Sequence, residues 1–256
     1  MRQQFRARFS VTSRRLTVRI GIALTTTLIL AATAQPHAAD RVHEPQTGTF
    51  VTDKGWGQLD LMRDASGVLR FDISSINGNA TCEVSGVVLG EIGETDSSAD
   101  ACRVTLKRIS GGILVNTITD EACRQFCGFN AGIDGEYFAR PKACSPISQQ
   151  TTRSRFQRAY DQRKYAEARK TLDPWFGRCR HFLDWSTEAE IRNDLAVTYH
   201  KLGMRAACLK VLEPYTLAAR GTDDAAIEGW QPSTAEIWLD IVHRARTNLR
   251  LCEKLR

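Results

Sequence analysis

The sequence predicts an α+β protein in which a small disulfide-stapled antiparallel β-barrel or sandwich is followed by an α-helical repeat domain. Three observations lead to this prediction. Apolar and polar residues alternate along residues 50–120, apolar residues recur at helical spacing from residue 151 onward, and all eight cysteines follow an N-terminal export signal. We expect a cleavable signal peptide at residues 1–34, a β-rich disulfide domain at 35–148 and a helical domain at 149–256.

Residues 1–34 have the composition of a secretory signal. The first 19 residues hold six arginines and no acidic residue, and an apolar run of 13 residues follows from Ile20 to Ala32. This run is too short for a stop-transfer helix, and Ala32-Thr33-Ala34 predicts cleavage before Gln35. We therefore expect a periplasmic or secreted protein with no stable membrane anchor after cleavage. A retained N-terminal anchor is the alternative, and Ser13-Arg14-Arg15 leaves twin-arginine export open beside the general secretory route.

The net charge of the mature chain argues against binding to nucleic acid. The whole chain has 35 Lys+Arg against 29 Asp+Glu, but six of the arginines belong to the signal, so the remainder is balanced. The balance is uneven along the chain, because residues 40–148 hold 10 basic and 15 acidic side chains whereas residues 149–256 hold 19 and 14. The opposite net charges would attract the two parts to each other or to a charged partner. The alternative is that these charges belong to an ordinary solvated surface.

The period-two pattern of the first part predicts short strands with one buried face. Alternation is strict in Leu69–Ser74 and Cys102–Lys107, and residues 58–63, 81–89 and 113–118 are similar. Turn sequences separate these segments: Asp64-Ala65-Ser66-Gly67, Asn77-Gly78 and Gly111-Gly112. Strands at this spacing predict an antiparallel meander that closes into a barrel or sandwich.

The cysteines predict structural disulfides. They are Cys82, Cys102, Cys123, Cys127 and Cys144 in the first part and Cys179, Cys208 and Cys252 in the second. Both numbers are odd, so complete pairing requires at least one disulfide between the parts, and we expect it to start from Cys144. Cys82 and Cys102 are in phase with the inward residues of their strands. Cys123 and Cys127 offer only two soft ligands with no histidine nearby, so disulfides are favoured over a zinc or redox site.

The pattern Cys123-x3-Cys127-Gly128-x2-Ala131-x3-Gly135-x-Tyr137, ending at Cys144, resembles the exported domain of the LprI-like lysozyme-inhibitor family. The resemblance covers about residues 80–144 and implies a periplasmic protein that occludes the cleft of a lysozyme-type muramidase. Ser85-Gly86 also resembles the Ser-Gly loop of another periplasmic lysozyme-inhibitor class, although Leu89 replaces the tyrosine of that motif. This makes Ser85 and Gly86 candidate partner-binding residues, and a plain turn or strand glycine is the alternative.

The second part contains two apolar patterns of helical spacing, 40 residues apart. Leu172-Asp173-Pro174 aligns with Leu212-Glu213-Pro214, so we expect two helical hairpins that each end at a proline. Residues 234–252 add a closing helix, and the whole resembles a tetratricopeptide-like array. Such arrays usually present a groove to a partner. The alternative is that this array only supports the barrel. Four aromatic residues near Cys179 are expected in the core: Trp175, Phe176, Phe182 and Trp185.

No residue pattern indicates catalysis, and we predict neither a metal site nor a cofactor. His181, His200 and His243 match no metal or triad motif, and a carboxylate pair of a glycosidase would leave no sequence signature. We therefore expect an exported, non-enzymatic binding protein that inhibits or neutralises a lysozyme-type cell-wall hydrolase. The alternatives are a periplasmic scaffold or assembly factor that binds a protein through its helical repeats, or an immunity protein against a delivered toxin.

Overall fold

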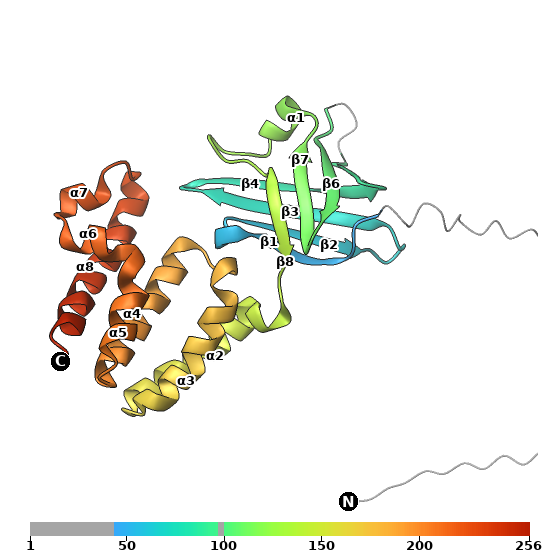
Figure 1. The fold of residues 1–256 in the computed structure, drawn as a ribbon. Helices are drawn as coiled ribbons and strands as arrows, with labels where there is room; N and C mark the ends of the chain where they lie inside the picture. Colours follow the sequence, from blue (N-terminus) through green and yellow to red (C-terminus); the bar gives the residue numbers. More distant parts are fainter. Residues whose placement is uncertain (1–43, 97–99) are drawn as a thin grey trace, which may run out of the picture. The chain divides into compact units, whose positions relative to one another are not determined.

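The computed structural model of the protein describes residues 44–96 and 100–256 (Figure 1). These residues fall within one compact unit, whose chain first forms a β-barrel and then a helical region. The predicted signal peptide, residues 1–34, lies outside the described residues. Within the described ranges, no helix combines the length and the apolar character needed to cross a membrane. The boundary predicted at residue 148 falls inside the first long helix.

Eight antiparallel strands form a closed barrel, in which each strand pairs with the next and the last returns to the first. The strands are β1 (Gly48–Thr52), β2 (Gly57–Arg63), β3 (Leu69–Asn77), β4 (Ala80–Leu89), β5 (Ile92–Glu94), β6 (Arg103–Ile109), β7 (Gly112–Thr117) and β8 (Gly135–Ala139). Closure pairs Val51 of β1 with Phe138 of β8. The predicted meander therefore closes as a barrel, and its five predicted strands are β2, β3, β4, β6 and β7.

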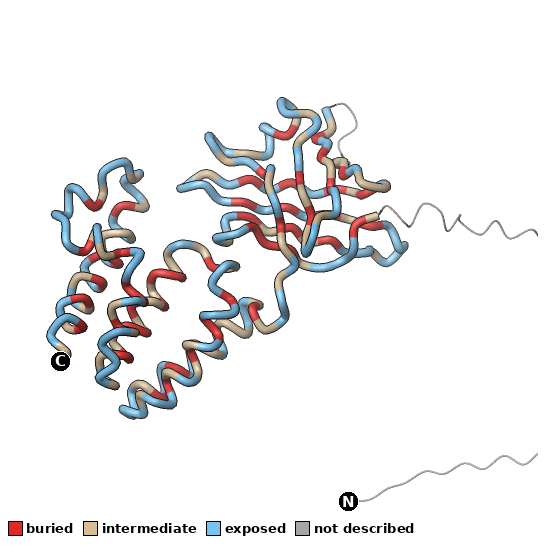
Figure 2. The backbone as a smooth tube through the Cα atoms, in the orientation of Figure 1, coloured by how far each residue is buried: buried red, intermediate tan, exposed pale blue. Residues whose placement is uncertain are grey.

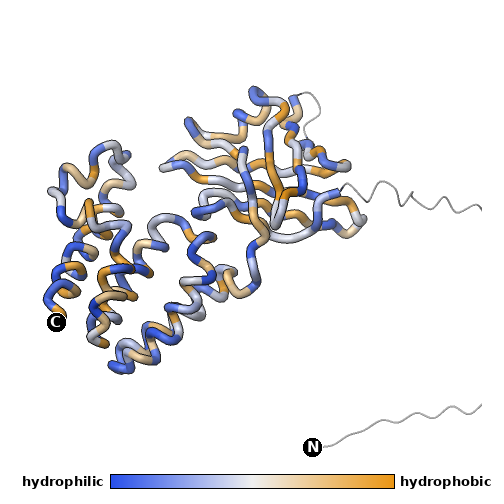
Figure 3. Tube along the Cα trace, viewed as in Figure 1, coloured by the Kyte–Doolittle hydropathy of each residue, from blue (hydrophilic) through white to orange (hydrophobic). Residues whose placement is uncertain are grey.

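Because apolar and polar residues alternate along the strands, every second side chain is apolar and points into the barrel. In β3, Leu69, Phe71 and Ile73 are buried in the barrel core, whereas the intervening side chains are exposed or half-buried. Figure 2 shows the alternation of buried and exposed residues along the strands, and Figure 3 shows the matching alternation in hydropathy. Burial of one apolar face per strand is the main stabilising contribution to such a barrel.

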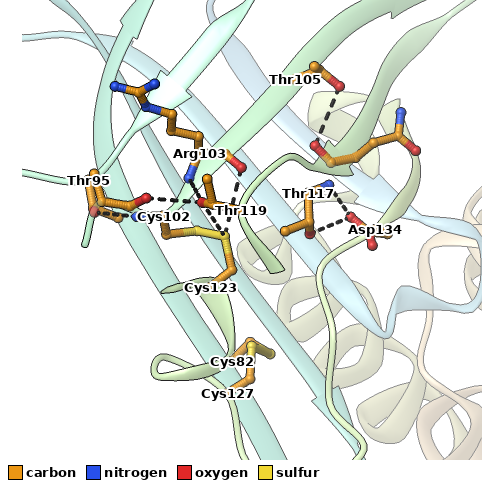
Figure 4. Close-up of a disulfide and its surroundings, with 12 residues drawn as sticks. Cys82, Thr95, Cys102, Arg103, Thr105, Thr117, Thr119, Cys123, Cys127 and Asp134 are labelled. Carbon is orange, nitrogen blue, oxygen red and sulfur yellow. Dashed lines mark hydrogen bonds between the residues drawn. A yellow bond between two sulfur atoms is a disulfide. The ribbon is translucent and has the colours of Figure 1, made fainter. Parts of the chain in front are cut away.

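Two disulfides attach the segment after β7 to the barrel wall (Figure 4). Cys82 of β4 pairs with Cys127, and Cys102 pairs with Cys123 in the short helix α1 (Asp120–Arg124). The two cysteines that are four residues apart therefore take separate partners, one in β4 and the other just before β6. This confirms that they are structural, as predicted.

The second part of the chain is helical. Its helices are α2 (Pro146–Asp161), α3 (Tyr165–Cys179), α4 (Trp185–Lys201), α5 (Arg205–Leu212), α6 (Thr216–Arg220), α7 (Asp223–Ile227) and α8 (Pro232–Glu253). Side chains of the preceding residue cap three of them: Ser145 accepts from the amide of Ser148, Asp184 from those of Ser186 and Thr187, and Thr222 from that of Ala225. Prolines occupy the first turn of α2 and α8, where no amide hydrogen bond is lost. The predicted closing helix at 234–252 is α8.

The turns that join α2 to α3 and α4 to α5 have the same backbone geometry. Each turn has one residue in the left-handed region, Arg163 (φ 60°) in the first and Gly203 (φ 69°) in the second. The amide of the next residue, Lys164 or Met204, donates to the carbonyl five residues earlier, at 2.9 Å in both turns. The equivalent residues are 40 apart, the offset expected from the sequence.

The predicted end of the first hairpin at Pro174 is wrong. Helix α3 continues through Pro174 to Cys179, so the proline removes one amide donor without ending the helix. In the second hairpin the α-helix ends at Leu212, and Pro214 lies in a 3-10 turn, Glu213–Tyr215.

Two further disulfides staple the helical region. Cys144, which lies between β8 and α2, pairs with Cys179 at the end of α3, and Cys208 of α5 pairs with Cys252 of α8. The first confirms the disulfide predicted from Cys144 to the second part of the chain. All eight cysteines are thus paired.

We expect the double variant Cys144→Ala/Cys179→Ala to lose about 3 kcal/mol of unfolding free energy, because the disulfide closes a loop between residues 35 apart. Urea unfolding of the oxidised proteins, followed by circular dichroism, measures this loss. An unchanged midpoint in the double variant would mean that the disulfide does not constrain the unfolded chain.

Candidate binding groove at the barrel–helix junction

The turn between β1 and β2 brings the barrel into close contact with the helical region. Lys54 (φ 67°) and Gly55 (φ 62°) both have left-handed backbone conformations in this turn. A Cβ atom on Gly55 would lie 2.9 Å from the backbone nitrogen of Asp184 and 3.0 Å from the carbonyl oxygen of Phe182. Only glycine fits both the conformation and this distance, so the contact between the two parts depends on it.

A buried ion network holds the same contact. Lys54 Nζ lies 3.1 Å from Glu188 Oε2, and Arg192 Nη2 lies 2.6 Å from Glu188 Oε1. The Glu188 side chain is 8% exposed and that of Arg192 is 11% exposed. Burial raises the pKa of Glu188, but hydrogen bonds from Arg192 and Lys54 outweigh it and hold the pKa below its usual value. The Arg192 guanidinium also lies 5.1 Å from the ring centroid of Phe176, so the ion network is anchored in the helical core.

Beside this contact, tryptophans from separate elements gather at the surface. Trp56 and Trp185 are each 37% exposed, although large apolar side chains are usually covered. The Trp185 ring packs edge-on against Trp230 with a centroid distance of 4.9 Å. Trp230 in turn stacks on Trp238, with centroids 4.8 Å apart and an interplanar angle of 9°.

The rings of Trp56, Trp185 and Trp230 line a groove between the barrel and the helices, which we call the junction groove. It consists of one hollow of about 640 Å³ and an adjoining one of about 340 Å³, and the two share Gly55, Trp56, Ile76 and Asp184. The larger hollow is further lined by Lys54, Asn77, Gly78, Trp185, Glu228, Gly229, Trp230, Gln231 and Thr234. Ile76 of β3 is 59% exposed and adds apolar surface on the barrel side. An exposed apolar surface between two fixed walls is typical of a binding site.

The tryptophans differ in whether their indole N–H has a hydrogen-bond acceptor within the protein. Trp238 Nε1 donates to the Ala226 carbonyl at 2.7 Å, and Trp175 Nε1 donates to the Ala143 carbonyl at 2.8 Å. For the indole N–H groups of Trp56, Trp185 and Trp230, the described part of the chain provides no acceptor. Three residues of the groove lining thus have an indole N–H without an acceptor among the described residues.

The charged side chains of the larger hollow are largely engaged within the protein, and the smaller hollow adds Glu83 and Arg140. Lys54 is paired with Glu188. The Asp184 carboxylate accepts hydrogen bonds from the amides of Ser186 and Thr187 at 3.0 and 2.9 Å. Burial raises the pKa of Asp184, but these hydrogen bonds outweigh it, so that its pKa is lowered overall. Glu228 is exposed and, among the described residues, has no cationic partner.

The predicted aromatic core is correct in part. Trp175 and Phe176 are buried in the helical core and Phe182 packs against it. Trp185 departs from the prediction, because the cap at Asp184 starts helix α4 there and leaves the ring in the exposed first turn. Sequence reasoning also missed Trp56 and Trp230, which come from opposite ends of the described chain.

The structure places the candidate residues Ser85 and Gly86 within strand β4 and not in a loop. Ser85 is an exposed residue opposite Asp72 of β3, and Gly86 is buried opposite Phe71. A Cβ atom on Gly86 would lie 2.0 Å from the carbonyl oxygen of Glu94. Gly86 is thus a strand glycine, and its lack of a side chain has a packing reason.

A second hollow, of about 580 Å³, lies at the part of the barrel that carries α1. Carboxylates dominate its lining, namely Glu94, Asp100, Asp120 and Glu121. Arg103 pairs with Glu94 at 2.9 Å, whereas the described residues give no basic partner to the other three. This hollow is thus an acidic surface.

Neither a metal-binding cluster nor a similar known protein adds to the assignment of a functional site. In residues 44–96 and 100–256, no group of three or more His, Cys, Asp or Glu side chains is placed to hold a metal ion. Comparison of the chain with protein-family models, with curated proteins and with solved structures found no match. The junction groove is therefore assigned from its geometry alone.

Proposed function

We propose that the protein is a binding protein that holds a segment of a partner protein in the junction groove. The observation that carries this proposal is the convergence of Trp56, Trp185 and Trp230, each with an indole N–H open to a ligand. Tryptophan is the residue type most enriched where protein interfaces gain most of their binding energy. The groove walls are held by a glycine contact and a buried ion network, which limits the entropy lost on binding.

The helical region supports the same proposal. The hairpins α2–α3 and α4–α5 have matching turns 40 residues apart, and we infer that they are two repeats of tetratricopeptide type closed by α8. Repeats of this kind stack side by side and usually bind peptides or proteins. Trp185 begins the second repeat and Trp230 lies just before the closing helix, so one wall of the groove belongs to this array.

The four disulfides fit a compartment that is oxidising. Together with the signal expected at residues 1–34, they support a location in the periplasm or outside the cell. The partner would then be another exported protein or an envelope protein.

Trp185→Ala is expected to weaken peptide binding at least tenfold, because it removes a ring and a donor from the centre of the groove. An array of immobilised peptides of random sequence, probed with the oxidised protein, measures this effect across many ligands. Leu217→Ala is the matched control, since Leu217 lies in α6, is 89% exposed and does not line the groove. Equal binding by both variants would place the binding surface elsewhere.

The acidic hollow favours a second candidate function, inhibition of a basic lysozyme-type hydrolase. Asp100, Asp120 and Glu121 would attract a basic protein and orient it on the barrel. This candidate agrees with the family resemblance of the barrel sequence, although its site is not the Ser85-Gly86 segment.

For this candidate we expect stoichiometric protection of peptidoglycan from at least one of the c-, g- and i-type lysozymes. The variant Asp120→Asn/Glu121→Gln should reduce that protection several-fold, and more at low ionic strength. Trp185→Ala should leave it unchanged. Turbidity of a peptidoglycan suspension measures the lysis, and lysis at the uninhibited rate with all three enzymes would exclude lysozyme inhibition.

A further inference from the structure

We propose, on the basis of the proposed function, that the occupant of the junction groove is an extended, proline-containing segment with a basic residue at one end. Proteins bind peptides in a few recurring ways, and the chemistry of the groove lining favours one of them.

Addition of a strand to the barrel is not available to a ligand. Each strand of the closed barrel is already paired on both sides, including β1, which pairs with β2 and β8. Recognition of a phosphorylated or acidic segment is also disfavoured, because such sites use several free cations. The larger hollow has one cation in its lining, Lys54, which is already paired with the buried Glu188, and the smaller hollow adds only Arg140.

The open donors of the groove match an extended segment of polyproline II type. Such a segment has no internal hydrogen bonds, so its carbonyl groups are free to accept. The indole N–H groups of Trp56, Trp185 and Trp230 are donors of this kind. Proline itself has no backbone N–H, so it needs no acceptor from the groove.

The arrangement of the rings matches proline side chains. Trp185 meets Trp230 at 65° and Trp238 at 69°, while Trp230 and Trp238 are stacked. This makes a corner with two aromatic faces. Ile76 lies on the opposite, barrel side of the groove and is 59% exposed. Flat apolar rings such as those of proline pack well against aromatic faces, as in other aromatic-lined grooves that bind this conformation.

Charge complementarity fixes the residue at the end of the segment. Lys54 and Asp184 are engaged within the protein, so the larger hollow contributes one carboxylate without an ionic partner among the described residues, that of Glu228. Glu228 is exposed and close in sequence to Trp230. A lysine or arginine that follows the prolines would pair with it.

Isothermal titration of the oxidised protein with three peptides tests this proposal. The probes are nine prolines followed by arginine, nine prolines followed by glutamate, and a glycine–serine peptide of equal length ending in arginine. We expect the proline–arginine peptide to bind at least tenfold more tightly than the glycine–serine peptide. It should also bind about two- to fivefold more tightly than the proline–glutamate peptide, the range of an exposed ion pair. Glu228→Gln should remove the second difference and keep the first.

The controls separate this inference from the proposed function. Trp185→Phe keeps the ring but removes the donor, and we expect it to weaken the proline–arginine peptide several-fold, while Leu217→Ala should have no effect. Proline peptides that bind no better than glycine–serine peptides, on a protein that still binds arrayed peptides through Trp185, would overturn the inference and leave the proposed function standing. Tighter binding of chitotetraose than of any peptide would overturn both in favour of a glycan.

Discussion

Gly86→Ala is expected to prevent stable folding of the barrel, with a loss on the order of 4 kcal/mol or more. The new Cβ atom would lie 2.0 Å from the carbonyl oxygen and 2.6 Å from the carbonyl carbon of Glu94. Both are backbone atoms of the neighbouring strand β5, so no change of side-chain rotamer relieves the clash. Circular dichroism and urea unfolding of the variant measure the effect.

Gly177→Ala is the matched control for this substitution. Gly177 lies within α3, is exposed, and has no atom within 4 Å of the position of a new Cβ. Alanine there should stabilise the helix by about 0.5–1 kcal/mol, because it reduces the conformational entropy of the unfolded chain. If Gly86→Ala were as well tolerated as Gly177→Ala, the close approach of β5 to Gly86 of β4 would be incorrect.

Arg192→Met is expected to cost about 3–5 kcal/mol, because it leaves the Glu188 carboxylate buried with only one partner. Thermal unfolding at neutral pH measures this loss. Lys54→Met provides the comparison, since its side chain is 54% exposed and we expect a change below about 1 kcal/mol. A neutral effect of Arg192→Met would mean that Glu188 is solvated.

The same network predicts how stability depends on pH. The folded state lowers the pKa of Glu188 below its usual value of 4.5, so the unfolded chain binds a proton at a higher pH than the folded protein does. The contribution of Glu188 is therefore present above pH 4.5 and decreases as the pH falls toward the lowered pKa. Glu188→Gln should unfold at a midpoint that changes less with pH in this acidic range than that of the unmodified protein.

The strands with several inward residues were predictable from the sequence. In β3 four buried residues, and in β6 two, alternate with outward ones, which is enough for the period to be read. In β5 and β8 a single residue is buried, Gly93 or Tyr137. A single inward residue gives no period in the sequence, so these strands are identified only in the structure, by their pairing with neighbouring strands.

The disulfide connecting Cys144 to the helical part was predictable from the odd numbers of cysteines, but the remaining pairs were not. Cys82 pairs with Cys127 and Cys102 with Cys123 because the segment between β7 and β8 folds back onto the barrel, where the Glu83 amide of β4 donates to the Phe126 carbonyl. The sequence order of the cysteines does not contain that information.

The junction groove could not be predicted from the sequence for a similar reason. Trp56 and Trp230 lie at opposite ends of the described chain and meet one groove because Gly55, which has no Cβ atom, lets the turn lie close to the backbone of Asp184. Trp185 was assigned to the core from its closeness to Cys179, whereas the cap at Asp184 turns the chain there and exposes the ring. The exposure of an aromatic residue is set by the fold around it and not by its neighbours in the sequence.

The most direct test of the proposed binding site is the set of indole N–H signals in a nitrogen–proton correlation spectrum. The protein has five tryptophans, so the signals of individual rings can be assigned by substitution and followed during titration with a peptide selected on the array. We predict that the signals of Trp56, Trp185 and Trp230 shift, while that of Trp175 stays in place because its N–H group donates to Ala143 and its ring lies outside the groove. A bound peptide that shifts none of the first three signals would contradict the assignment of the junction groove as the binding site.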